Sequence, residues 1–196
     1  MRLAQASAAA ALPNVSLVSA MDLGSLHSQA GSCHSAQKPE LGARLALALK
    51  AAVYDRQTVW ASPAARRVTK MAGGGVAVDL TAPGGRGLVL NTSVRCPAEI
   101  SPLFCTGVGF ELCSGSATAA GNTGSSRCVP AEAVLANSTR VVLHASAAVG
   151  GQMAAQEVTR VRSAFADWPL VLLRDAATGL PALPFDLEIG AGAGAA

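Results

Sequence analysis

The hydrophobic pattern of this chain changes its period once, and that change limits the folds open to it. Apolar residues first recur at every fourth position, as Leu41, Leu45, Leu49 and Val53. This spacing predicts an amphipathic helix of about four turns. Pro39 stands at a plausible first helical position, with Glu40 in the first turn, where the helix dipole favours an anion. Because strand-like spacing replaces the helical period further on, we expect a domain boundary within residues 55–63.

The segment before this helix has the order of an α/β layer. Residues 2–11 are expected to be the end of a helix that Pro13 stops. Val15–Met21 is a short, nearly continuous apolar run before Asp22, which predicts a buried parallel strand. A loop rich in Gly, Ser and His follows over residues 24–37. One strand and one helix do not make a sheet, so residues 1–55 are predicted to be an incomplete α/β unit.

The rest of the chain reads as an all-β module. The expected strands are Val76–Leu80, Gly87–Leu90, Val108–Leu112, Arg140–His144, Val158–Ala164 and Leu170–Leu173. Turn residues separate them, which is typical of a β-sandwich or a jelly-roll-like domain. We expect this domain to span residues 56–192, with an exposed loop at 113–127 and a disordered Gly/Ala tail at 193–196.

Composition excludes several classes of protein. Hydrophobic residues make up 51% of the chain and charged residues 14%, which argues against a disordered segment. The formal charge of +3 is spread along the chain. Arg66, Arg67 and Lys70 form the one tight basic group, too few cations for a surface that follows phosphates, so no nucleic-acid partner is expected. No apolar stretch is long enough for a membrane-spanning helix, so no membrane partner is expected either.

Cysteines and glycosylation motifs bear on compartment. Cys33 stands alone, and a second group follows as Cys96, Cys105, Cys113 and Cys128. Their spacing does not match zinc sites, so no metal is expected. Two disulfides are possible within the group, and all three pairings stay open. Three Asn-x-Ser/Thr motifs, at Asn14, Asn91 and Asn137, favour a secretory or lysosomal lumen.

Three segments carry a resemblance. Residues 2–24 hold a Leu-Pro-Asn turn and an Asp-Leu-Gly strand end, and residues 34–48 begin with His34 and lead into Gly-Ala-Arg-Leu-Ala. The third segment joins Phe-Ala-Asp-Trp-Pro at 165–169 to Gly-Leu-Pro-Ala-Leu-Pro-Phe at 179–185. Together they resemble, in order, the C-terminal portion of the sialate O-acetylesterases, a family of SGNH-type carbohydrate esterases.

The resemblance implies both a fold and a chemistry. Residues 1–55 would be the last strand and helix of an SGNH-type hydrolase layer, and residues 56–192 the C-terminal β-domain. In such enzymes a serine hydroxyl attacks the acetyl ester of sialic acid or another acetylated sugar. A histidine takes the serine proton and returns it to the sugar alcohol. The implied partner is therefore an acetylated carbohydrate, and no cofactor is implied.

His34 matches the histidine position and is the one catalytic candidate. The acid that normally precedes this histidine and the proline that follows it are replaced by Gly31 or Ser32 and by Ser35. Asp22 lies twelve residues upstream, and whether it orients His34 stays open. The chain has no Gly-x-Ser-x-Gly motif. We therefore expect it to be inactive alone, a piece of a longer protein whose N-terminal half supplies the nucleophile.

A second hypothesis is a non-enzymatic β-sandwich that binds carbohydrate or a protein. Trp168 could then stack on a sugar ring, but the architectural character of its segment favours packing in the core or between the two parts. Under the first hypothesis, an esterase fragment, the Leu41/Leu45/Leu49 face would have no sheet to cover, and we expect it to be exposed and prone to association.

Overall fold

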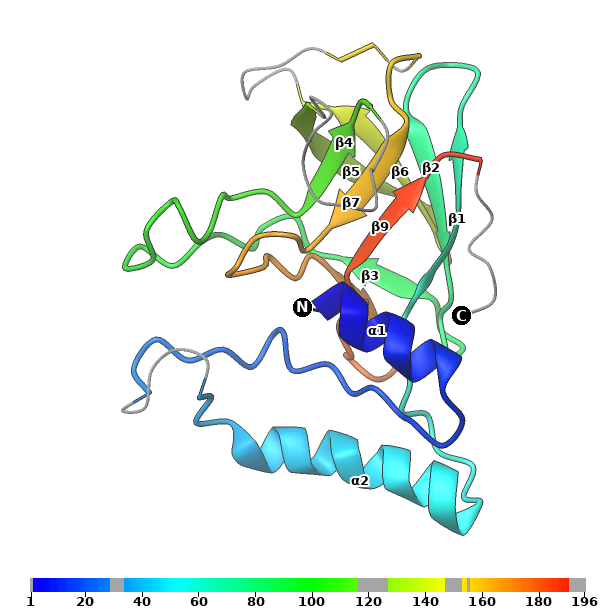
Figure 1. Cartoon of the computed structure of the whole chain (residues 1–196), viewed down its shortest axis with the longest axis vertical. Helices are drawn as coiled ribbons and strands as arrows, with labels where there is room; N and C mark the ends of the chain where they lie inside the picture. Colours follow the sequence, from blue (N-terminus) through cyan, green and yellow to red (C-terminus); the bar gives the residue numbers. More distant parts are fainter. Residues whose placement is uncertain (1, 29–33, 116–126, 147–152, 155, 191–196) are drawn as a thin grey trace.

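The computed structural model describes residues 2–28, 34–115, 127–146, 153–154 and 156–190. The predicted tail at 193–196 and most of the predicted 113–127 loop lie outside these residues, as does Cys33. The described part contains two helices and nine strands (Figure 1). They are α1 Arg2–Ala11, α2 Lys38–Tyr54, β1 Ala65–Lys70, β2 Val76–Leu80, β3 Leu88–Leu90, β4 Phe110–Cys113, β5 Cys128–Asn137, β6 Arg140–Ala145, β7 Arg160–Ser163, β8 Leu173–Asp175 and β9 Phe185–Glu188.

Seven strands form one antiparallel sheet in the order β1-β2-β6-β5-β4-β7-β9. The sheet curls until its edges meet, because the Gly190 N–H just after β9 donates to the Val68 carbonyl of β1 at 3.4 Å. β3 and β8 form a separate two-stranded sheet, joined to the larger one where the Leu88 N–H donates to the Ser138 carbonyl at 2.8 Å. The β-rich second part is thus confirmed, as one nearly closed sheet in place of the expected sandwich.

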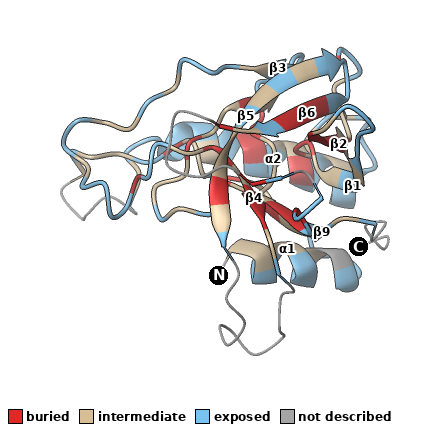
Figure 2. Cartoon of the chain, turned by 90° about the horizontal axis from the view of Figure 1, so that it is seen from above, coloured by how far each residue is buried: buried red, intermediate tan, exposed pale blue. Residues whose placement is uncertain are grey.

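The core lies inside this curled sheet. Alternate residues of the strands point inward, among them Val68, Val78, Leu112 and Leu143, all nearly inaccessible to solvent. Phe110 of β4 and Phe185 of β9 meet with their ring centroids 6.5 Å apart. Burying one side chain of this kind stabilises a fold by about 1.5–3 kcal/mol. Figure 2 shows the buried residues concentrated in the strands, whereas α1 is half-buried or exposed.

Two disulfides settle the pairing that the sequence left open. Cys96 bonds to Cys105, and Cys113 bonds to Cys128. The second bond joins directly opposed residues of β4 and β5. It closes a loop of 15 residues, for which chain entropy gives about 3 kcal/mol of stabilisation.

The expected helix and most expected strands are confirmed. α2 carries a proline in its first turn together with Glu40, and β2 has the predicted bounds. The strand expected at 170–173 begins only at Leu173. β1, β5 and β9 were not predicted.

The parallel strand expected at Val15–Met21 is wrong. Residues 15–20 belong to no helix or strand, Met21 lies in a turn, and none of them pairs with a strand in the described part of the chain; Val15 is 45% exposed. A parallel strand needs a neighbour to take up its backbone hydrogen bonds, and none of the described strands supplies one here. That residues 1–55 derive from a hydrolase layer stays a prediction.

Candidate active-site cleft

A cleft of about 570 Å³ lies where the N-terminal residues meet the β-rich part. α1 forms one wall, and the extended residues 17–24 and the first turn of α2 form another. Residues 167–169 and 183–184 close the side formed by the β-rich part. The polar side chains on its lining are those of Arg2, Gln5, Ser19, Ser35, Lys38 and Asp167.

The position of α1 is set by one side chain. The guanidinium of Arg2 donates to the carbonyl oxygens of Ala164 and Ala166 at 2.8 and 2.6 Å, and to that of Asp167 at 3.3 Å. Ala164 has a left-handed backbone, with φ of 56°, which turns the chain sharply after β7. Three carbonyls of this turn are thereby directed at one cation, and hydrogen bonds to charged donors are the stronger kind.

Trp168 packs between the two parts, as expected for an interface role. Its backbone N–H donates to the Phe104 carbonyl at 2.8 Å. The edge of its ring lies so close to Gly24 that an added Cβ there would approach to 3.0 Å. The Asp-Leu-Gly sequence at 22–24 therefore needs its glycine for this contact, and the indole holds the extended segment against the β-rich part.

Asp22 accepts hydrogen bonds from two arginines near the cleft. Its two carboxylate oxygens accept from Arg44 at 2.8 and 2.9 Å, and one also accepts from Arg174 of β8 at 2.7 Å. The side chains of Asp22 and Arg44 are only 6% and 8% exposed. Burial favours the neutral carboxyl, but the hydrogen bonds and charges of Arg44 and Arg174 outweigh it, so the pKa of Asp22 is lowered.

Arg44 ties this cluster to two further groups. It donates to the Ser19 carbonyl at 2.9 Å and to Glu40, one turn earlier on α2, at 3.0 Å. Its hydrogen bonds with Asp22 outweigh desolvation, so the pKa of Arg44 is raised. We call Asp22, Arg44 and Arg174 the anchor cluster. It joins residues 19–22, α2 and β8, and so ties the N-terminal part to the β-rich part beside the cleft.

His34 is exposed and lies at the entry to α2. Its neighbour Ser35 lines the cleft, and the Ser35 hydroxyl oxygen accepts from the Gln37 N–H at 2.9 Å just before the helix starts. Of the other histidines, His27 is exposed, and the His144 ring lies against Gly75. That His34 is a catalytic histidine stays a prediction.

Sequence reasoning missed the anchor cluster. The pairing of Glu40 with Arg44 could have been found, because residues four apart face each other on a helix. Asp22 and Arg174 are 152 residues apart, and nothing in local spacing relates them. Within the described residues no group of three or more His, Cys, Asp or Glu side chains could hold a metal. No helix there is both long and apolar enough to cross a bilayer.

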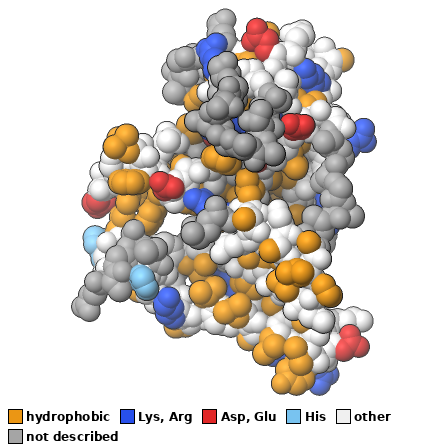
Figure 3. Space-filling model, in the orientation of Figure 1, with side chains coloured by type: hydrophobic (Ala, Val, Ile, Leu, Met, Phe, Trp, Pro, Cys, Tyr) orange, Lys and Arg blue, Asp and Glu red, His pale blue; other side chains and the backbone are white. Residues whose placement is uncertain are grey.

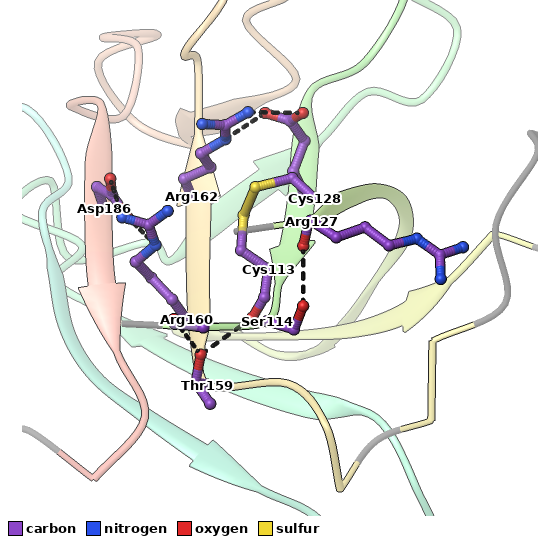
Figure 4. Close-up of a disulfide and its surroundings, with 10 residues drawn as sticks. Cys113, Ser114, Arg127, Cys128, Thr159, Arg160, Arg162 and Asp186 are labelled. Atoms are coloured by element: carbon purple, nitrogen blue, oxygen red, sulfur yellow. Dashed lines mark hydrogen bonds and ion pairs between the residues drawn. A yellow bond between two sulfur atoms is a disulfide. The ribbon is translucent and has the colours of Figure 1, made fainter. Parts of the chain in front are cut away.

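A second charged group lies on strands β4, β7 and β9, beside the Cys113–Cys128 disulfide (Figure 4). Arg162 forms a bidentate pair with Glu111 at 2.7 and 3.1 Å and lies over the Phe165 ring, 4.3 Å from its centroid. Arg160 and Asp186 approach to 3.3 Å between Nε and Oδ1, yet within the described residues neither of these two atoms is hydrogen-bonded. Burial therefore dominates and raises the pKa of Asp186, although Arg160 and Arg162 oppose it.

No family model and no curated protein matches this chain. Among solved structures the chain is similar to a carbohydrate acetylesterase from Xanthomonas citri, with 23% sequence identity and a TM-score of 0.53. The match covers 80% of this chain but only 29% of that one. At this identity the likeness shows the fold, and the chain spans less than a third of the length of the protein it matches.

Proposed function

We propose that this chain is part of a carbohydrate acetylesterase. The observation that carries the proposal is the shared fold over 80% of the chain with a carbohydrate acetylesterase. The resemblance of residues 34–48 to a catalytic-histidine segment agrees with it, and those residues begin beside the cleft. In this proposal residues 1–55 complete an SGNH-type catalytic layer, residues 56–192 are an accessory β-domain, and the finer substrate is an O-acetylated sialic acid.

His34 would act as the general base and acid of ester hydrolysis. Its imidazole takes the proton of a serine hydroxyl as the serine oxygen attacks the acetyl carbonyl. The bond to the sugar oxygen breaks, and the imidazolium returns the proton to that oxygen. Water then attacks the acetyl-serine by the same route and releases acetate. The serine would come from sequence outside this chain, because no nucleophile motif occurs within it.

The first experiment asks whether the purified chain hydrolyses acetyl esters. We expect no hydrolysis above background, with p-nitrophenyl acetate and O-acetylated sialic acid as substrates. Activity of the isolated chain that His34→Ala abolishes would mean that a nucleophile does reside here, and would overturn the view that it lies elsewhere.

The second experiment supplies the missing part. A chimera would carry this chain in place of the matching 29% of the Xanthomonas citri enzyme. A cooperative unfolding transition would first establish that the chimera folds. We expect it to hydrolyse acetylated sugars, and His34→Ala to lower kcat by about 100-fold or more, the usual contribution of a general base. His27→Ala, at another exposed histidine, is the matched control. Equal loss in both variants, or in neither, contradicts the assignment of His34.

A further inference from the structure

Most asparagines of this sequence stand in Asn-x-Ser/Thr motifs. The chain has four asparagines, and three of them, Asn14, Asn91 and Asn137, stand two positions before a serine or threonine with no proline between. Serine and threonine together make up only 27 of the 196 residues. Random placement would put such a residue two positions after an asparagine about one time in seven. Three motifs among four asparagines are therefore a marked excess.

Asn137 lies at the tip of the β5–β6 hairpin, opposite Arg140 in the register. It is exposed, and its Oδ1 accepts from the backbone N–H of Thr139 at 2.9 Å and from the Thr139 hydroxyl at 3.4 Å. This is an Asx-turn, in which the side-chain carbonyl is bound to the backbone two residues on. The hydroxyl of the motif is thereby held beside the side-chain amide.

Asn91 repeats this arrangement in a different setting. It follows β3 directly and is exposed, and its Oδ1 accepts from the Ser93 N–H at 2.9 Å. Its own backbone N–H donates to the Leu172 carbonyl at 2.8 Å, so the backbone is fixed while the side chain faces outward. Asn14 is also exposed but differs, because it has a left-handed backbone with φ of 60°. Within the described residues its side chain makes no hydrogen bond to Ser16.

We propose that Asn91 and Asn137 are N-glycosylated. In both, the amide is exposed and the third residue of the motif is already bound to it. The two disulfides independently favour an oxidising secretory compartment, where this modification takes place. The motif is recognised on the surface of secreted proteins, and neither asparagine belongs to the buried core.

The co-substrate is a lipid-linked oligosaccharide diphosphate. The asparagine Nδ2 attacks the anomeric carbon of the first sugar, and a C–N bond forms. The bond from that carbon to the diphosphate oxygen breaks, and the lipid diphosphate leaves with the electron pair. Nδ2 loses one proton to a base of the transferase. No oxidant or reductant is involved.

The two glycans would stand at the two ends of β3. β3 lies between the two motifs, because the Leu88 N–H binds the Ser138 carbonyl and Asn91 follows Leu90. Val89 of β3 is 50% exposed, and Val134 of β5 is 59% exposed. Glycans at Asn91 and Asn137 would shield these valines from contact with other molecules.

The test is site mapping on the full chain produced through the secretory route of a eukaryotic cell. Peptide N-glycosidase in heavy-oxygen water converts each glycosylated asparagine to a labelled aspartate, which peptide mass spectrometry locates. We expect label at Asn91 and Asn137, and lower occupancy at Asn14. Asn137→Gln should lower the apparent mass on a gel by that of one glycan and leave Asn91 occupied.

Several results would overturn the proposal: no label at all, label at Asn14 alone, or label at only one of the two proposed sites. The chain made in bacteria is the glycan-free control for the mass assignment. This experiment does not depend on ester hydrolysis, so its outcome and that of the proposed function are separate.

Discussion

The N-terminal residues 1–55 and the β-rich remainder are held together by different forces. The β-rich part has a continuous apolar core, two disulfides and a nearly closed ladder of hydrogen bonds. The N-terminal part buries few apolar side chains, chiefly Leu23 and Ala48. It is attached through Arg2 and through the anchor cluster. In Figure 3 hydrophobic side chains gather at the end of the molecule formed by α2.

This difference teaches that the β-rich part is stabilised by a buried core, whereas the N-terminal part exposes most of its large apolar side chains. Leu45, Leu49, Val53 and Tyr54 of α2 are all more than half exposed, whereas Arg44 of the same helix is buried. The expected exposure of the Leu41/Leu45/Leu49 face is thus confirmed for its last two residues. α2 therefore contacts the rest of the molecule through Arg44 and Ala48, while Leu45 and Leu49 face solvent.

The largest expected effect is in the core. Phe110→Ala removes a ring that is 2% exposed and meets Phe185, so we expect the unfolding free energy of the β-rich part to fall by about 4 kcal/mol. Phe104→Ala is the control, because Phe104 is 53% exposed, and it should change stability by no more than about 0.5 kcal/mol. Chemical denaturation measures both. Similar losses in the two variants would contradict the core described above.

The second-largest effect should be a loss of stability confined to the N-terminal part. Asp22→Asn removes the charge that Arg44 and Arg174 share, and leaves buried Arg44 with the half-exposed Glu40 as its remaining counter-charge. We expect the N-terminal part to open more easily by about 2–3 kcal/mol, while the β-rich part keeps its stability. Hydrogen exchange of the α2 amides against those of β6 measures this.

Asp79→Asn is the matched control for that variant. Asp79 pairs with Arg140 in the same bidentate geometry, but the two side chains are 28% and 44% exposed. An exposed pair contributes at most about 1 kcal/mol, so α2 exchange should not change. If Asp22→Asn accelerated exchange in α2 and β6 equally, the two parts would be one cooperative unit.

Lowering the pH should change the stability of the two parts in opposite directions, through Asp22 in the N-terminal part and Asp186 in the β-rich part. The pKa of Asp22 is lowered from 3.8, so its stabilisation is present above that value and is lost as the pH falls through the folded pKa. The pKa of Asp186 is raised from 3.8, so its contribution is present below that value and is lost as the pH rises through the folded pKa. Asp186→Asn should remove this second dependence, and Asp22→Asn the first.

Chemical denaturation of the two variants and of the wild type across pH 2–7 gives the unfolding free energy as a function of pH and tests both directions. We expect each change to be smaller than the effect of Asp22→Asn at neutral pH. An Asp186→Asn curve parallel to that of the wild type would show that Asp186 titrates alike in the folded and unfolded chains.

The smallest effect on stability should come from the exposed face of α2. Leu49→Lys places a charge where the side chain is 54% exposed, so stability should change by no more than about 0.5 kcal/mol, while self-association at high concentration should fall. Ala43→Lys adds the same charge on another exposed position of the helix and should leave association unchanged. Sedimentation velocity would record this, and equal behaviour of the two variants would argue against an adhesive apolar face.

Local pattern predicted the elements whose own residues carry the signal. α2 has its spacing of four and β2 its alternation, and both formed as expected. The hydrophobic pattern did not predict β1 or β5. β1 carries three basic residues around one buried valine, and β5 contains a proline and three alanines. β5 is a strand because β4 and β6 pair with it on both sides. Val15–Met21 shows the converse, a strand-like sequence that pairs with none of the described strands.

The candidate site was predictable only in part. His34 was named from the residues around it, but the cleft beside it is formed by segments from residue 2 to residue 184. Trp168 was expected to pack at an interface, and it does so against Gly24. The anchor cluster depends on Arg174, which only the folded chain brings to Asp22. Contacts between residues so distant in sequence are fixed by topology, which local spacing does not report.

The meeting of β1 and β9 also sets an order of events during synthesis. β9 is the last strand among the described residues, and it supplies Phe185 to the core and the partner that closes the sheet onto β1. A ribosome releases β1 long before β9, so β1 must wait with one edge bare until residues 185–188 have emerged. A barrel that depends so much on distant pairings folds slowly. Messages truncated before Phe185 should therefore yield chains that the quality-control machinery removes.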